Sequence, residues 1–318
     1  MKIFTYNILA PSLAAWENYK NHKYCPKKYM IWSYRKKLIM KQILVSDADV
    51  ICLQEIQNDI YYNIIPKMYK CGYIGIFTPK NKSVITGVID GCAIFIKQTY
   101  QFIKFKSIDY YNLYKKYLRK NTLIVDTKRG KKAMCGLVCL IKKINTNYQF
   151  VISTIHLIAD PTIPDVKNLQ TICVLNELSL MSESGKIPFI LCGDFNSLPN
   201  SSVYETITTG YINFKNKELL IKDSIKPKQI KYKLNMKSSY KLLNNKEPEY
   251  TNYTDVFNGT LDYIFVSNHW NVKKVGNIPS IPVITNENAI PNSKFPSDHI
   301  PLSVDLTLKK KQKIFIRK

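Results

Sequence analysis

Residues 187–197 read IPFILCGDFNS, and this stretch decides the fold. The apolar run from Phe189 to Cys192 follows a proline and precedes a glycine, a pattern that predicts a buried strand with an abrupt end. Asp194 and Asn196 come directly after the run and share one face while the chain stays extended. A carboxylate at the end of a buried strand is costly unless a cation or a donor meets it. Taken alone, the stretch is also typical of a turn, because Gly, Asp and Asn are turn residues.

The same arrangement recurs along the chain, where further apolar runs end in polar functional groups. These groups are Asn7, Glu55, His156, Asp262 and the pair Asp298-His299. The hydrophobic pattern predicts strands over 3–9, 48–55, 73–78, 91–97, 135–144, 149–154, 189–192, 259–266 and 303–308. It predicts helices over 33–44, with Ser33 as N-cap, over 61–69 and over 165–182. Residues 100–123 are too rich in Tyr and Lys to assign from the pattern.

Length and composition are those of a globular protein with an unusual charge. The 318 residues are 45% hydrophobic and 22% charged, and they can bury a sizeable core. The formal net charge of +24 favours phosphate-rich partners, nucleic acid first. Because no repeat or linker divides the chain, we expect one domain over residues 1–318. A long basic loop, which can contain short helical turns, is expected over 215–248 and a basic tail over 309–318.

The eight cysteines form no C-x-x-C pair and have no histidine at zinc-finger spacing, so we expect reduced thiols. The chain begins with a strand-like segment rather than a signal peptide, and no apolar run approaches membrane-spanning length. These features predict a soluble protein of the cytoplasm or nucleus that does not bind membranes.

Oxygen ligands at several strand ends suggest a site for a hard cation. Glu55, Asp194 and Asn7 offer the carboxylate and amide oxygens that Mg²⁺ and Mn²⁺ prefer. Each residue has a plain alternative by itself: Glu55 can be a surface acid and Asn7 a turn former. Their shared placement at strand ends favours the site.

Two of the four histidines fall in the same strand-end motifs. His156 and His299 can contact an anionic oxygen or move a proton near neutral pH. Asp262 can orient one of these imidazoles from another strand. His22 and His269 stand in polar, loop-like contexts and are expected at the surface. A metal, an acid and a histidine around one pocket predict a site that cleaves phosphodiesters.

The polar strand-end motifs resemble those of the endonuclease/exonuclease/phosphatase superfamily and occur in the order of that superfamily. They are TYNIL (5–9), LQE (53–55), TIH (154–156), CGDFNS (192–197), LDYIF (261–265) and SDHIPL (297–302). Other segments are similar to the carbon-catabolite-repressor-type deadenylases, the nuclease subunits of a cytoplasmic poly(A)-shortening complex. These segments are YCP (24–26), WSYRKK (32–37), DGCAIF (90–95), DP (160–161) with DVK (165–167), and YTNYT (250–254).

The resemblance implies a four-layer α/β/β/α sandwich of two mixed, mainly antiparallel sheets, as in deoxyribonuclease I. It also implies one or two Mg²⁺ ions, for which Mn²⁺ can substitute. Metal binding falls to Glu55, with Asn7 acting through water and Asp298 nearby. The catalytic roles fall to His156 and Asn196 on the phosphate, Asp194 on the attacking water, and His299 oriented by Asp262. The terminal adenine would lie between Pro161 and Phe257.

The activity implied by the resemblance is a poly(A)-specific 3′–5′ exoribonuclease that releases 5′-AMP and works with other subunits of a deadenylase complex. The chain departs from such relatives in two respects. It starts at the first strand, without the leucine-rich repeats that often precede the nuclease. Residues 157–159 read LIA where a bulkier aromatic is usual, which leaves the strictness of adenine recognition open. The alternatives are a nocturnin- or 2′-phosphodiesterase-like enzyme acting on a nucleotide, and a non-catalytic RNA-binding relative.

Overall fold

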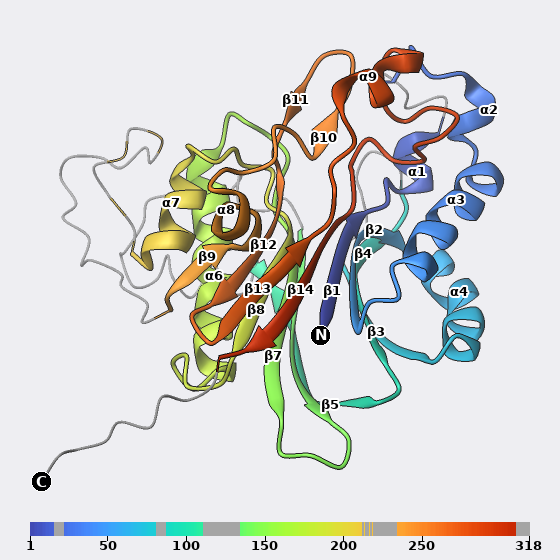
Figure 1. Ribbon diagram of the computed structural model, residues 1–318. Helices are drawn as coiled ribbons and strands as arrows, with labels where there is room; N and C mark the ends of the chain where they lie inside the picture. The colour runs from blue at the N-terminus through green and yellow to red at the C-terminus, as the bar shows by residue number, and fades with distance from the viewer. Residues whose placement is uncertain are drawn as a thin grey trace, which may run out of the picture.

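Two six-stranded sheets pack face to face, and helices cover their outer faces (Figure 1). The computed structural model describes residues 1–15, 22–80, 87–110, 134–211, 213, 216, 218 and 234–309. Within these residues, the four-layer α/β/β/α sandwich predicted from the sequence is confirmed.

The first sheet combines strands from both ends of the described chain. Its strand order is β13-β14-β1-β2-β4-β3, in which β1 and β2 are parallel and the other neighbours antiparallel. The strands are β1 (Lys2–Asn7), β2 (Val50–Gln57), β3 (Tyr73–Pro79), β4 (Asp90–Lys97), β13 (Trp270–Val275) and β14 (Leu302–Leu308).

The second sheet comes from the middle of the chain. Its strand order is β5-β6-β7-β8-β12-β9, with one parallel pair, β7 and β8. The strands are β5 (Tyr100–Asp109), β6 (Cys135–Lys143), β7 (Gln149–His156), β8 (Phe189–Asp194), β9 (Met236–Ser238) and β12 (Asp262–Ser267). A separate ribbon pairs β10 (Asn252–Tyr253) with β11 (Asn258–Gly259).

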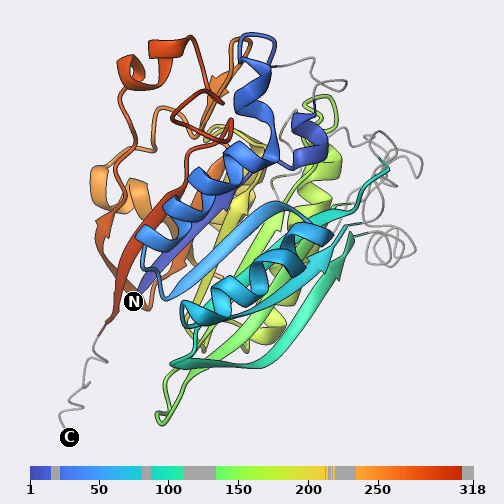
Figure 2. The same cartoon turned by 90° about the vertical axis from the view of Figure 1, so that its right-hand side faces the viewer.

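Long helices lie on the outside of each sheet. Figure 2 shows α3 (Trp32–Val45) and α4 (Asn58–Lys70) across the first sheet, and Figure 1 shows α6 (Pro164–Met181) and α7 (Ser202–Thr209) on the side of the second. The shorter helices are α1 (Pro11–Ala14), α2 (Lys27–Met30), α8 (Ser239–Asn244), α9 (Ile281–Ile284) and the 3₁₀ turn η3 (Thr285–Glu287). In the described chain, no helix combines the length and the apolar character needed to cross a membrane.

Three apolar cores hold the layers together. One lies between the sheets and includes Ile94, Phe150 and Ile264, while the others join each sheet to its own helices. Each fully buried large side chain contributes about 1.5–3 kcal/mol relative to its exposed state. One polar side chain also bridges the sheets: Gln54 donates through Nε2 to Thr5 Oγ1 at 3.0 Å and to Thr154 Oγ1 at 2.8 Å. This link lies one residue from Glu55 and ties together strands that carry site residues.

The structure corrects the predicted start of α3 and adds two strands, β5 and β9, that the pattern did not predict. Ser33 lies inside α3, whose N-cap is Ile31 without a side-chain cap. β5 runs through the start of 100–123, where the pattern gave no assignment. The prediction of a long loop over 215–248 missed β9 in its last part, whereas α8 agrees with the short helical turns expected there. β9 is a three-residue edge strand and α8 has six residues, so neither is long enough to give a hydrophobic period. Residues 219–233 and 310–318 lie outside the described chain.

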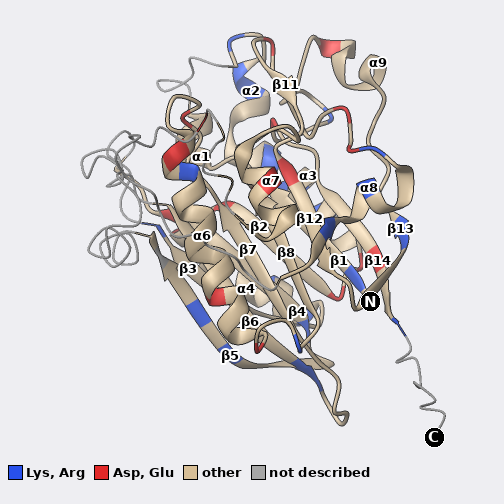
Figure 3. Cartoon of the chain, turned by 90° about the vertical axis from the view of Figure 1, so that its left-hand side faces the viewer, with Lys and Arg blue, Asp and Glu red and all other residues tan. Residues whose placement is uncertain are grey.

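Basic residues are spread over several surfaces of the sandwich. Figure 3 shows Lys and Arg along β5 and β13 among other elements. Lys104 and Lys106 of β5 and Lys273 and Lys274 of β13 are exposed. Exposed basic side chains, which contribute to the positive charge expected from the composition, therefore lie on both sheets.

Candidate active site

The predicted site residues lie at strand ends that meet at one end of the sandwich. Asn7 ends β1 and Glu55 lies near the end of β2, and these strands are parallel. His156 and Asp194 end the parallel strands β7 and β8 in register with each other. Asp262 begins β12 directly opposite Asp194. Because parallel strands end at the same edge of a sheet and the two sheets face each other, these side chains converge.

Two backbone irregularities aim the side chains. A β-bulge between Leu53 and Ile56 places Glu55 at a φ of 57°, a conformation uncommon outside glycine. Gly193 has a φ of 130°, and a Cβ there would lie 2.1 Å from the carbonyl oxygen of Ile155. Only glycine therefore fits immediately before the Asp194 carboxylate.

The Asn7 amide joins the two sheets at the site. Its Nδ2 donates to Glu55 Oε1 and to Asp194 Oδ2, both at 3.0 Å. Its Oδ1 accepts from the backbone N–H of Leu9 at 3.0 Å, which fixes the orientation of the amide. The other oxygen of Glu55 accepts from the backbone N–H of Ala10 at 2.8 Å. The carboxylates of two different sheets are thus held on one amide group.

His156 faces both of these carboxylates. Its Nε2 lies 3.9 Å from Glu55 Oε1 and 3.6 Å from Asp194 Oδ2. Burial lowers the pKa of His156 below its ordinary value, and it outweighs the opposing attraction of Asp194 and Glu55. The imidazole is therefore neutral near pH 7 and can donate or accept a hydrogen bond.

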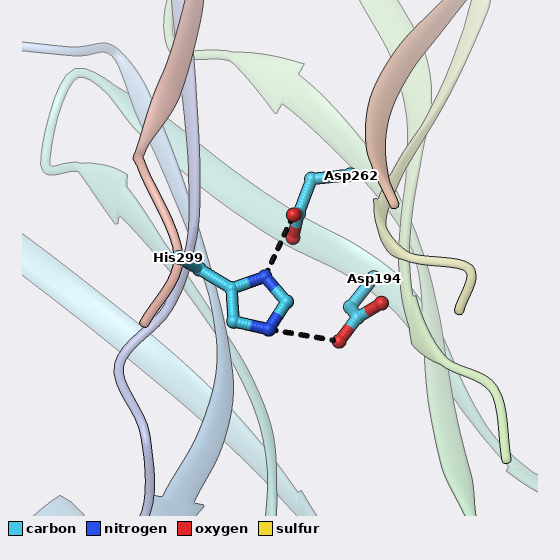
Figure 4. Close-up of side chains that lie close together, drawn as sticks. All are labelled: Asp194, Asp262 and His299. Atoms are coloured by element: carbon cyan, nitrogen blue, oxygen red, sulfur yellow. Dashed lines mark hydrogen bonds and ion pairs between the residues drawn. The ribbon is translucent and has the colours of Figure 1, made fainter. Parts of the chain in front are cut away.

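His299 has the opposite electrostatic character. Its Nδ1 donates to Asp262 Oδ2 at 2.7 Å, and its Nε2 lies 3.7 Å from Asp194 Oδ2 (Figure 4). Burial acts to lower the pKa of His299, but the charges of Asp262 and Asp194 raise it well above its ordinary value. Thr251 Oγ1 donates to the same Asp262 oxygen at 2.7 Å and holds this carboxylate in place. His299 is a buried imidazolium oriented by a carboxylate.

Asp194 is 1% exposed and lies between the two histidines. Burial raises the pKa of Asp194, against the lowering effect of His299. Its Oδ1 accepts from the backbone N–H of Asn196 at 2.8 Å. Asn196 itself has a φ of 45°, and its Nδ2 donates to the carbonyl of Leu157 at 2.8 Å. Asp194 is accordingly a more basic carboxylate than one in water.

Asp298 lies at the edge of this group and has a partner that the sequence did not predict. Its Oδ2 lies 3.3 Å from Nε2 of His22. Burial opposes the charge of Asp298, but His22 and His299 outweigh it, so the pKa of Asp298 lies below its ordinary value. The expectation of a surface His22 is wrong, because this side chain is 7% exposed and packs against an acid 276 residues away. His269 is partly exposed beside Ser267, next to the turn after β12.

A cleft of about 910 Å³ opens over the site. Residues predicted to bind the base lie at its sides: Pro161 is exposed, and Phe257 is 39% exposed. Sequence reasoning missed Thr251, and it missed Lys167, which lines the cleft and donates to the carbonyl of Asn196 at 2.6 Å. The predicted residues that line the cleft are Glu55, His156, Pro161, Asp194, Asn196, Phe257, Asp298 and His299, while Asn7 (1% exposed) and Asp262 (3%) are buried beside them.

This arrangement agrees with a comparison to known families. Residues 4–299 match the model of the Endonuclease/Exonuclease/phosphatase family. The chain belongs to this family. Among curated relatives, the CCR4-Not complex 3′-5′-exoribonuclease subunit Ccr4 of Kluyveromyces lactis is 31% identical over 307 residues, which are 89% of the chain and 38% of the relative. The CCR4-NOT transcription complex subunit 6-like-B of Xenopus laevis is 31% identical over 96% of the chain and 63% of its own length. The chain therefore spans less than two thirds of these relatives.

Two solved structures have the same fold as this chain. ANGEL2, a 2′,3′-cyclic phosphatase solved with adenosine-2′,3′-vanadate, superposes with a TM-score of 0.81 at 24% identity, covering 97% of the chain and 96% of ANGEL2. The human Nocturnin catalytic domain superposes with a TM-score of 0.69 at 27% identity, covering 97% and 94%.

The donor set at the cleft floor fits a hard divalent cation. Asp194, Asp262 and His299 each offer a ligand atom, and these atoms lie within 4.8 Å of one another. Asp262 already accepts hydrogen bonds from His299 and Thr251 at one oxygen, Oδ2. Glu55 and Asp194, by contrast, share one neutral amide and a neutral imidazole. Two carboxylates that converge on one amide at the cleft floor suit a metal that prefers oxygen ligands.

Proposed function

We propose that the chain is a Mg²⁺-dependent 3′–5′ exoribonuclease that shortens the poly(A) tails of mRNA and releases 5′-AMP. The observation that carries the proposal is the convergence of Glu55, Asp194, His156 and His299 at the floor of one cleft. Relatives at 31% identity that are named 3′-5′-exoribonuclease subunits support the choice of reaction and substrate.

In this proposal Glu55 is the main ligand of the cation. Asn7 acts beside it through a water molecule, and Asp298 completes the surroundings from the facing loop. The hydrogen bonds from Asn7 and Ala10 leave each Glu55 oxygen a further lone pair. Bound Mg²⁺, for which Mn²⁺ can substitute, neutralises charge on the phosphate oxygens. Whether one or two ions bind, the same residues hold them.

The remaining polar residues carry the hydrolysis. Asp194, whose pKa is raised by burial, takes a proton from the attacking water. The water oxygen forms a bond to phosphorus, the bond from phosphorus to the 3′ oxygen breaks, and that oxygen takes a proton from solvent to become the new 3′ hydroxyl. The charged His299, held by Asp262, stabilises the negative phosphoryl group, and neutral His156 donates a hydrogen bond to it. Asn196 contacts another phosphate oxygen.

The sides of the cleft suit a terminal adenosine. Phe257 offers an exposed ring and Pro161 an exposed apolar edge, and both line the cleft. Stacking of a base on an aromatic side chain contributes about 1–3 kcal/mol. The net charge of +24 attracts the RNA backbone that follows. We further propose that the protein works with other subunits of a deadenylase complex in the cytoplasm or nucleus, as the names of its relatives suggest.

The test is a gel assay of 5′-labelled RNA with a 3′ oligo(A) tail beside RNA with a mixed tail, in Mg²⁺ or in EDTA. The proposal predicts a Mg²⁺-dependent ladder that stops where the adenines end. Equal shortening of both tails would make the protein a general 3′ exonuclease. If neither tail shortens and an RNA 2′,3′-cyclic phosphate is hydrolysed instead, the deadenylase proposal is wrong.

A further inference from the structure

Arg35 is a fully buried arginine at the start of α3 whose partners are backbone carbonyls. Its exposure is 0%, and it is the largest of the fully buried side chains in the described chain. Nε donates to the carbonyl of Met30 at 3.1 Å, and Nη2 donates to that of Leu9 at 2.7 Å. Nη1 donates to the carbonyls of Ile8 at 3.0 Å and Pro296 at 2.8 Å. Burying a guanidinium is costly, and burial lowers the pKa of Arg35 to about 10.

Two of these carbonyls belong to the loop that orients the proposed cation ligands. Leu9 has a φ of 53° and donates its N–H to Asn7 Oδ1, while its carbonyl accepts from Arg35. The next residue, Ala10, donates its N–H to Glu55 Oε2. The N–H groups of Leu9 and Ala10 therefore point at the site, while the carbonyls of Ile8 and Leu9 point at the guanidinium.

Another carbonyl belongs to the segment that carries the SDH motif. Pro296 directly precedes Ser297, whose hydroxyl donates to the Asn7 carbonyl at 2.8 Å and accepts from the His299 N–H at 3.2 Å. Arg35 thus joins the loop after β1 to the segment before β14. Figure 1 shows that the start of α3, α1 and the chain around α9 gather at the same end of the molecule.

We propose that Arg35 is a positioning residue that sets the affinity of the Glu55 site for its divalent cation. It does so by holding residues 8–10 and residues 296–299 in fixed positions relative to each other. The inference rests on the proposed function in one respect, the presence of a cation at Glu55. A lysine cannot replace this residue, because one ammonium group cannot reach carbonyls spread around a planar guanidinium. Outer partners that orient metal ligands change metal affinity by 10- to 100-fold when removed.

The test measures Mn²⁺ binding by the loss of the free-ion electron paramagnetic resonance signal, with Mg²⁺ as competitor. Arg35→Lys should bind Mn²⁺ about 10- to 100-fold more weakly than wild type. Tyr34→Phe is the matched control: Tyr34 lies on the same helix, and its hydroxyl donates to the carbonyl of Ser293 at 2.7 Å rather than to residues 8–10 or 296–299. Its Mn²⁺ affinity should equal that of wild type. Excess Mg²⁺ should restore hydrolysis by Arg35→Lys.

A folded Arg35→Lys, judged by its near-ultraviolet circular dichroism, with wild-type Mn²⁺ affinity overturns the inference. If Arg35→Lys does not fold, Ser297→Ala carries the test, because it removes a single hydroxyl and with it the bond to the Asn7 carbonyl, a second link between the same two segments. An affinity of Ser297→Ala equal to wild type then overturns it. If wild type binds no Mn²⁺, both the metal dependence in the proposed function and the proposed role of Arg35 are wrong. If wild type and Arg35→Lys bind Mn²⁺ with equal affinity, only the proposed role of Arg35 is wrong.

Discussion

Asp262→Asn tests whether the charge of Asp262 raises the pKa of His299. In wild type, Asp262 Oδ2 accepts a hydrogen bond from Nδ1 of His299 at 2.7 Å, and both side chains are buried. The variant keeps the shape and the bond to Thr251 but removes the negative charge. We expect the pKa of His299, which the charges of Asp262 and Asp194 hold well above its ordinary value, to fall.

The magnitude follows from the lost interaction. A hydrogen bond to a charged group contributes about 1.5–3 kcal/mol to the stability of the fold. The neutral amide of Asn retains part of this stabilisation. Because the folded-state pKa of His299 is raised, its stabilising effect is complete below the unfolded value of about 6.5 and is lost as pH rises through the folded value. Asp262→Asn should therefore lower the free energy of unfolding by about 1–3 kcal/mol near pH 6. The difference from wild type should shrink at higher pH.

The assay is proton NMR of the imidazole signals in EDTA, which is practical because the chain has only four histidines. His299→Gln identifies the signal. Asp255→Asn serves as control, because Asp255 is an exposed acid just beyond β10. A wild-type His299 that titrates near 6.5, or a His299 pKa unchanged by Asp262→Asn, would refute the reasoning.

Three further predictions follow from the same geometry. Glu55→Gln should abolish Mg²⁺ binding in calorimetry and Mg²⁺-dependent hydrolysis, with a normal Tm in EDTA; retained binding would remove Glu55 as the main ligand. Phe257→Ala should raise KM for oligo(A) about 5- to 150-fold through lost stacking of about 1–3 kcal/mol, whereas the exposed neighbour Val256→Ala should not; an unchanged KM would place the base elsewhere. Gly193→Ala should destabilise the fold by at least about 3 kcal/mol in urea unfolding. The reason is that a Cβ at residue 193 would lie 2.1 Å from the Ile155 carbonyl oxygen and that the φ of this residue is 130°. A free energy of unfolding equal to that of wild type would contradict this geometry.

Strand-end chemistry made much of the site predictable. Asn7, Glu55, His156 and Asp194 each close an apolar run, and a buried run that ends in a polar group leaves few positions for that group. The layered arrangement was expected from the resemblance of these strand-end motifs to the endonuclease/exonuclease/phosphatase superfamily, not from the hydrophobic pattern. The local pattern was sufficient because the site lies where regular elements end.

Contacts across long sequence distances were not predictable in this way. His22 stands in a polar segment, and only the fold brings it to Asp298. Arg35 belongs to a basic helix whose pattern gives no sign that one guanidinium is buried, since the carbonyls of Ile8 and Pro296 lie 27 and 261 residues away. β9 is an edge strand of three residues, and its pairing with β12 rather than its own sequence defines it.

Hydrolysis of oligo(A) RNA in ¹⁸O-labelled water, with mass spectrometry of the products, tests the central claim most directly. We predict 5′-AMP with ¹⁸O in its phosphate and an RNA shortened by one nucleotide at a time, in Mg²⁺ and not in EDTA. Asp194→Asn should release no 5′-AMP. Release of a 3′-phosphorylated nucleotide, or of 5′-AMP at the same rate in EDTA, would contradict the assignment of this cleft as a metal-dependent 3′–5′ exoribonuclease site.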